Sequence, residues 1–185
     1  MNRNINQNRS FILSIICIIF IVFTIVFISV LSLKSNGLIK SDKDFIISKI
    51  NNYYGNSLHG YIELSPLWSL KKNDNPNDNS LHFKSTDGYL LTMSAFDSSK
   101  IKSYDLANNI YSNIKNKEYT AIQLDNERIN GYVAYKVVGF DMKVAKWVYT
   151  WVFEDNNNVT HSISIEGNNK NSSSFKIPFS YKVFK

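Results

Sequence analysis

An uninterrupted run of apolar residues, Phe11–Leu33, stands near the N-terminus and contrasts with the mixed pattern of the rest of the chain. This run of 23 residues contains no charged residue, glycine or proline. A helix of that length reaches roughly 35 Å, enough to cross a hydrocarbon core of about 30 Å with modest tilt. We therefore expect residues 11–33 to form a transmembrane helix that anchors the chain in a lipid bilayer.

A cleaved signal peptide is the alternative interpretation of this run. Signal-peptide cores are about 7–15 apolar residues long, and this run is longer. Lipidation of Cys17 is disfavoured, because Ile16 precedes it where a small residue is required. Basic residues flank the run on both sides, so charge leaves the orientation open. A short tail, residues 1–10, followed by the anchor and a whole domain favours a single-pass cell-membrane protein with its domain outside the cytoplasm.

Residues 34–57 have the pattern of a polar linker followed by a spacer helix. Apolar side chains recur at helical spacing over Phe45–Tyr54. Asp42 or Asp44 is placed to cap this helix, and Gly55 is placed to end it. We expect the spacer helix to separate the membrane anchor from the domain that follows.

The remaining residues, 58–185, show the alternation of apolar and polar positions that predicts strands. The expected strands are Tyr61–Leu64, Leu81–Ser85, Tyr89–Phe96, Tyr119–Ile129, Tyr132–Phe140, Val144–Glu154 and Val159–Ile165. Asp87-Gly88 and Asn130-Gly131 are strong hairpin signals between them. Lys71–Ser80, rich in Asn and Asp, predicts a solvated loop and does not match the calcium-loop pattern. Consecutive hairpins predict an antiparallel meander.

One clear helix is expected within this domain, over residues 103–117. Ser103 is a candidate N-cap. The apolar stripe of this helix consists of Leu106, Ala107, Ile110 and Ile114. We expect the sheet to bury one face against this stripe, which predicts an α+β domain. The tail, Ser172–Lys185, alternates like a strand but contains Pro178, and a short helical turn ending at Ile177 is the other possibility.

Composition and charge narrow the choice of partners. The 185 residues carry 21 basic and 15 acidic side chains, a net charge of +6. The charges are interspersed, without the clustered basic face that nucleic-acid binding requires, so we expect no nucleic-acid partner. Cys17 is the only cysteine, so the domain contains no disulfide and no thiol chemistry.

Two short segments carry a resemblance to a known family. They are Gly60–Trp68, a glycine-aromatic strand ending in Pro66 and Trp68, and Ile129–Tyr135, a turn with Gly131 and a later Ala-Tyr pair. With the order of elements, they make residues 58–185 resemble the PsbP-like family, relatives of the extrinsic protein of photosystem II that occur as membrane-anchored or secreted bacterial domains. The resemblance implies an antiparallel sheet with helices on its faces and transfers no catalytic residues. The family usually ends in a full helix, which conflicts with Pro178.

Three histidines, His59, His82 and His161, are the candidate bases or metal ligands. None has a partner at metal-ligand spacing. His161 lies on the apolar face of its strand, so we interpret it as a core histidine and as the first residue to test for base catalysis. The acidic pair Glu154-Asp155 is expected to be solvated in its turn.

An aromatic stripe runs along one face of the Val144–Glu154 strand. Its members are Trp147, Tyr149, Trp151 and Phe153. The stripe could stack sugars or bases, but stripes of this kind are more often core. We predict that Trp68 and one or more of these four side chains lie in the hydrophobic core.

These observations predict a non-catalytic binding or assembly module of the cell envelope, without metal, cofactor or catalytic residues. The expected partners are the lipid bilayer, through residues 11–33, and another envelope protein or a cell-wall component. The alternative is a carrier of an apolar ligand, or a hydrolase, with a pocket between the sheet and the helix.

Overall fold

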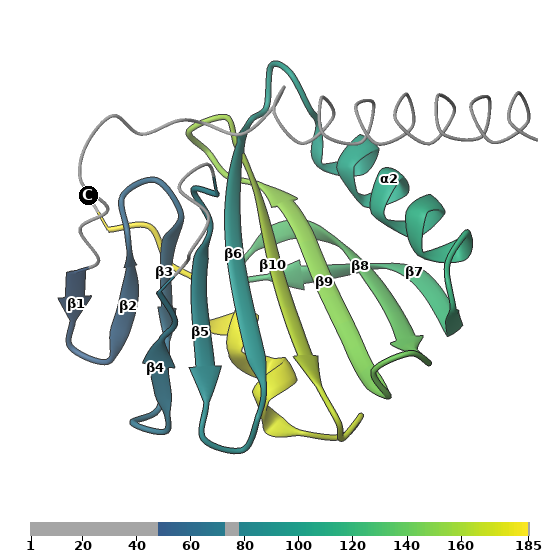
Figure 1. The fold of residues 1–185 in the computed structure, drawn as a ribbon. Helices are drawn as coiled ribbons and strands as arrows, with labels where there is room; N and C mark the ends of the chain where they lie inside the picture. The colour runs from purple at the N-terminus through teal and green to yellow at the C-terminus, as the bar shows by residue number, and fades with distance from the viewer. Residues whose placement is uncertain (1–47, 73–77, 185) are drawn as a thin grey trace, which may run out of the picture. The chain divides into compact units, whose positions relative to one another are not determined.

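The computed structural model describes residues 48–72 and 78–184, which form an α+β unit made mostly of antiparallel strands. The strands are β1 (Ser48–Ile50), β2 (Tyr53–Asn56), β3 (Gly60–Glu63), β4 (Trp68–Leu70), β5 (Leu81–Ser85), β6 (Leu90–Asp97), β7 (Tyr119–Ile129), β8 (Tyr132–Asp141), β9 (Lys146–Glu154) and β10 (Val159–Gly167). The helices are α2 (Ser103–Lys115) and the 3₁₀ helix η1 (Ser173–Ser180). The main sheet has the order β4-β5-β6-β10-β9-β8-β7, and a small sheet has the order β1-β2-β3 (Figure 1). The predicted α+β class is confirmed at this level.

The expected transmembrane helix, residues 11–33, lies outside the described residues, as do the tail 1–10 and residues 34–47 of the expected linker. Along residues 48–72 and 78–184, no helix is both long enough and apolar enough to cross a bilayer. The bilayer interaction therefore stays a prediction.

The prediction of a spacer helix over Phe45–Tyr54 is wrong for residues 48–54, the part of this segment that the structure describes. They form the β1–β2 hairpin instead, and the turn places Asn51 at a φ of 58°. Gly55 lies inside β2, where a Cβ would overlap the backbone carbonyl of Gly60 on β3. The pairing of β2 with β3 therefore prevails over the local helical spacing of the apolar residues, which is a short-range signal.

The predicted hairpins in the rest of the domain are confirmed. β5 and β6 pair as antiparallel neighbours on either side of Asp87-Gly88. β7 and β8 pair through Asn130-Gly131, whose φ values of 44° and 91° suit a two-residue turn of the I′ kind. β9 pairs with β8 on one side and with β10 on the other, so the last four strands form a meander.

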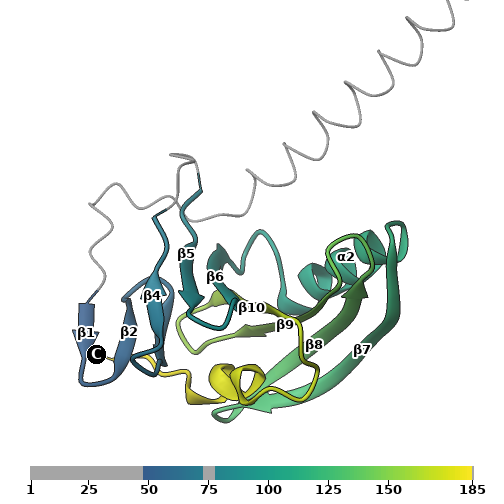
Figure 2. The same ribbon diagram turned by 60° about the horizontal axis from the view of Figure 1, so that its bottom comes forward.

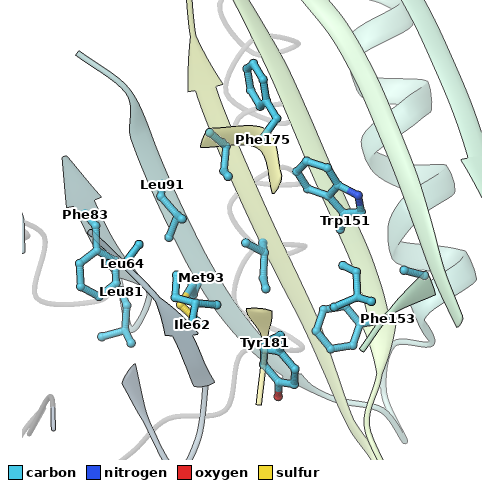
Figure 3. Packing of buried hydrophobic residues seen from close by; sticks show 14 of the residues in the cluster. Ile62, Leu64, Leu81, Phe83, Leu91, Met93, Trp151, Phe153, Phe175 and Tyr181 are labelled. Carbon is cyan, nitrogen blue, oxygen red and sulfur yellow. The ribbon is translucent and has the colours of Figure 1, made fainter. Parts of the chain in front are cut away.

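The main sheet buries side chains on both faces. The larger cluster contains Trp151 and Phe153 of β9, together with Ile163 of β10 and Phe175 of η1. Figure 3 shows Trp151, Phe153 and Tyr181 gathered with side chains of β5 and β6 in this cluster. The smaller cluster lies on the opposite face and joins α2 to Val137 and Val152. Figure 2 shows α2 and η1 on opposite sides of the sheet.

We expected the sheet to bury one face, against the helix, but it buries side chains on both faces. The α2 helix covers one face, and its stripe of Leu106, Ala107, Ile110 and Ile114 packs there as predicted. The aromatic stripe faces the other way, because alternate residues of a strand point to opposite faces. Its members Trp151 and Phe153 are buried, which confirms their core assignment, whereas Trp68 is only half-buried at the edge of the cluster.

The start of the predicted helix over residues 103–117 and the structure of the tail, Ser172–Lys185, both differ from the prediction. Ser103 is the first residue of α2, and the N-cap is Lys102, which has an extended backbone and makes no side-chain cap hydrogen bond. The Thr160 hydroxyl donates to the carbonyl of Ile101, which fixes where the chain enters the helix. The tail is neither a strand nor a turn ending at Ile177, because η1 continues through Pro178 to Ser180.

The contacts of α2 give a direct test of its orientation. Ile110→Asp should lower the free energy of unfolding by about 2–3 kcal/mol, because a carboxylate would replace an apolar side chain packed on Val137 and Val152. Asn109→Asp should change it by less than about 0.5 kcal/mol, because Asn109 is exposed. Urea denaturation of both variants measures the difference, and equal costs would contradict the orientation of α2.

Candidate functional site

A buried polar cluster around His161 is the strongest candidate for a functional site in the described part of the chain. His161 lies on β10 between Phe153 of β9 and Ala95 of β6, and its exposed fraction is 1%. Its Nε2 atom lies 3.2 Å from Asp155 Oδ2 and 3.1 Å from the Tyr181 hydroxyl. The expectation that His161 is a core histidine on the apolar face of its strand is confirmed.

Asp155 belongs to the turn between β9 and β10, and it is buried rather than solvated as the sequence suggested. Its Oδ1 atom accepts hydrogen bonds from the backbone N–H groups of Asn157 (2.8 Å) and Val159 (3.0 Å). Burial alone would raise the pKa of Asp155, but the hydrogen bonds from His161, Val159 and Asn157 together hold that pKa below its usual value. The carboxylate therefore shapes the turn and also contacts His161.

Tyr181 reaches the cluster from the C-terminal segment, directly after η1. Its side chain is fully buried, and its ring packs edge-to-face on Phe153 with centroids 4.8 Å apart. A Cβ on Gly60 would overlap this ring, so the glycine lets the tyrosine lie against the backbone of β3. The Asn130 side chain donates to the Tyr181 carbonyl at 2.8 Å, and burial raises the pKa of the phenol well above its usual range.

The other two histidines are not part of a shared ligand set with His161. His59 is buried in the turn between β2 and β3, where its Nδ1 atom lies 2.9 Å from Asn56 Oδ1. Burial, and then the proximity of His161, lower the pKa of His59 to about 4. His82, on β5, is half-buried and lies 3.1 Å from Asp78 Oδ2. Within residues 48–72 and 78–184, no group of three His, Cys, Asp or Glu side chains is arranged to hold a metal ion.

The geometry around His161 differs from that of a catalytic relay. In a catalytic triad, the carboxylate holds one imidazole nitrogen and the nucleophile uses the other. Here Asp155 and Tyr181 both approach Nε2, while Nδ1 is buried without a hydrogen-bond partner among the described residues. Because a carboxylate only accepts, the Nε2 proton points toward Asp155, and the Tyr181 hydroxyl cannot pass its proton to that nitrogen. The cluster joins β10, the turn after β9 and the C-terminal segment.

Besides Asp155, the carboxylates of Glu127 and Glu154 also have structural contacts. Glu127 Oε2 accepts a hydrogen bond from the Trp151 indole at 2.8 Å and lies 3.4 Å from Lys136 Nζ. Glu154 pairs with Lys102 at 3.3 Å, next to the start of α2. Asp125 is exposed on β7. The hydrogen-bond partners of the His161 ring among the described residues are Asp155 and Tyr181, and they include none of these three carboxylates.

Comparison with known proteins adds no family assignment. No protein-family model matches the chain, and a search of curated proteins finds no significant match.

Proposed function

We propose that the chain is a single-pass membrane protein whose extracytoplasmic domain, of the PsbP-like kind, is a non-catalytic binding or assembly module of the cell envelope. The uncharged run at residues 11–33 supports the anchor. The antiparallel sheet with a helix on one face is compatible with the PsbP-like resemblance. The arrangement of both polar partners on one nitrogen of His161 supports a structural role for the cluster.

The observation that carries the binding role is the edge strand β4. It ends the main sheet, and no strand of the described residues pairs with its outer side. Leu67 and Leu70 expose 58% and 53% of their surface there, next to the exposed Pro66 and the half-buried Trp68. An edge strand offers unpaired backbone groups to an extended segment of another chain, and apolar side chains beside it add contact area. We propose an envelope protein with an extended apolar segment as the partner.

The alternative of a pocket between the sheet and α2 has less support. Ala107, Val137 and Val152 are buried in contact across this space, and side chains of α2 and β7 pack around them. A carrier or hydrolase would use polar groups that converge on a cavity. The described side chains at this place are mainly apolar and packed together.

In-cell photo-crosslinking tests the binding role. A photoreactive residue at Leu70 of the full chain should yield a discrete adduct with one envelope protein, whereas the same group at Asn109, on the exposed face of α2, should not. Tyr181→Phe should leave the adduct unchanged, because it keeps the buried ring and removes only the hydroxyl beside His161. The same adducts from both positions, or none from Leu70, would contradict the β4 surface. Loss of the adduct in a folded Tyr181→Phe protein would argue that the His161 cluster acts in function.

A further inference from the structure

The tip of the β8–β9 hairpin combines exposed apolar side chains with lysines. Met142 and Val144 expose 53% and 54% of their surface; Lys143 lies between them, and Lys146 follows after Ala145. The Asp141 carboxylate accepts hydrogen bonds from the backbone N–H groups of Lys143 (2.9 Å) and Val144 (3.4 Å), which holds the turn in place. Met142 and Val144 are thus exposed at the end of a hairpin whose turn is held by hydrogen bonds to Asp141.

Aromatic side chains lie directly behind this tip. Phe140 and Trp147 flank the turn with ring centroids 5.3 Å apart, and both rings are half-buried. The Nζ atom of Lys170, from the loop after β10, lies 4.9 Å from the centre of the Trp147 ring. Exposed apolar side chains next to tryptophan and lysine are typical of protein segments at the boundary between lipid and water.

The charges around the tip are predominantly positive. The start of β7 lies beside the hairpin, since Tyr119 pairs with Asp141 and the Met142 N–H donates to the Glu118 carbonyl at 3.0 Å (lower right in Figure 1). The cationic side chains of these neighbouring segments are Lys115, Lys117, Lys143, Lys146 and Lys170. The carboxylates there are Glu118, Asp141 and Glu166, and Asp141 is directed at the turn backbone. The excess of lysines makes the end of the domain complementary to an anionic surface.

We propose that the β8–β9 hairpin is a second membrane contact, which inserts Met142 and Val144 into the interface of an anionic bilayer while the lysines meet lipid headgroups. This inference extends the proposed membrane anchoring, since a chain held by residues 11–33 would keep its domain close to lipid. A bilayer fits better than a protein groove, because the apolar contribution is two exposed side chains and the neighbouring segments carry five lysines against three carboxylates.

The test uses the full chain with Cys17→Ser, so that an introduced cysteine is the only one. Val144→Cys carries an environment-sensitive fluorophore, and Leu70→Cys is the matched control because its exposure, 53%, is nearly the same. In nanodiscs that contain phosphatidylglycerol, the label at position 144 should shift to shorter wavelength and be quenched by lipid brominated in its acyl chains. The label at position 70 should do neither.

Charge and salt dependence complete the test. Lys143→Gln with Lys146→Gln should weaken insertion by about fivefold for each lysine. Higher salt should weaken it as well, because the Debye length shortens. Insertion that is equal in phosphatidylcholine alone would overturn the assignment of an anionic surface.

Failure of the hairpin contact and failure of the anchor give different results. If the chain incorporates into nanodiscs and the label at position 144 stays unquenched, the hairpin contact is wrong and the anchor stands. If the chain does not incorporate, the same labelled protein is mixed with vesicles containing phosphatidylglycerol. Quenching at position 144 then supports the hairpin contact without the anchor, and no quenching overturns both.

Discussion

Trp151→Ala should lower the free energy of unfolding by about 3–5 kcal/mol, the largest loss we expect from shortening a single core side chain here. Trp151 is 2% exposed, and its ring stacks on Tyr149 with centroids 5.8 Å apart. The substitution leaves a cavity in the larger cluster and removes the indole N–H from Glu127 Oε2, 2.8 Å away. Urea denaturation at constant m-value measures the loss as a shift of the midpoint.

Trp68→Ala is the matched comparison, because both residues are tryptophans on strands of the main sheet. Trp68 is half-buried on the edge strand β4, so its removal should cost only about 1–2 kcal/mol. The sequence interpretation placed Trp68 in the core, although Pro66, two residues earlier, is typical of an edge strand or a strand break. Equal losses for the two variants would show that the edge of the cluster is as tightly packed as its centre.

The strands were predictable where the signal is local. β7 runs over the predicted residues, Tyr119–Ile129, because its alternation and the Asn130-Gly131 turn are encoded within about a dozen residues. The β1–β2 hairpin was not predictable from the sequence, because it depends on pairing with β3 and on a close approach of the backbone at Gly55. Helical spacing of a few apolar residues carries no information about a partner strand.

The candidate site was predictable only in part, and one overlooked signal was available. The predicted turn after Glu154 brings His161 opposite Phe153, and Asp155 continues the same strand face two residues beyond Phe153. Register alone would thus have placed the carboxylate near the imidazole instead of in solvent. Tyr181 had no comparable signal, because its position depends on η1, on Gly60 and on the Asn130 side chain.

Acid should destabilise the domain in two steps, and His59 accounts for the first. Its pKa is lowered from 6.5 to about 4 in the folded chain, so between these pH values the unfolded chain binds a proton that the folded chain excludes. Stability then rises with pH, and it falls as the pH drops from about 6.5 to about 4. The difference in pKa corresponds to about 3 kcal/mol lost over this window. Asp155, whose pKa is lowered, adds a second loss below about pH 4, as its carboxylate becomes protonated.

Urea denaturation of the full chain at a series of pH values separates the two steps. His59→Gln should flatten the dependence between pH 6.5 and 4, because no imidazole remains to be excluded from protonation, and should keep the loss at lower pH. Asn109→Gln is the control, since it changes an exposed residue of α2 and removes no titratable group, so it should leave the first window unchanged. The readout is the slope with pH, so a general loss of stability in either variant does not obscure it. A first window that persists in His59→Gln would assign the acid sensitivity to another group, and His161, the histidine whose proximity helps lower the pKa of His59, would be the next to replace.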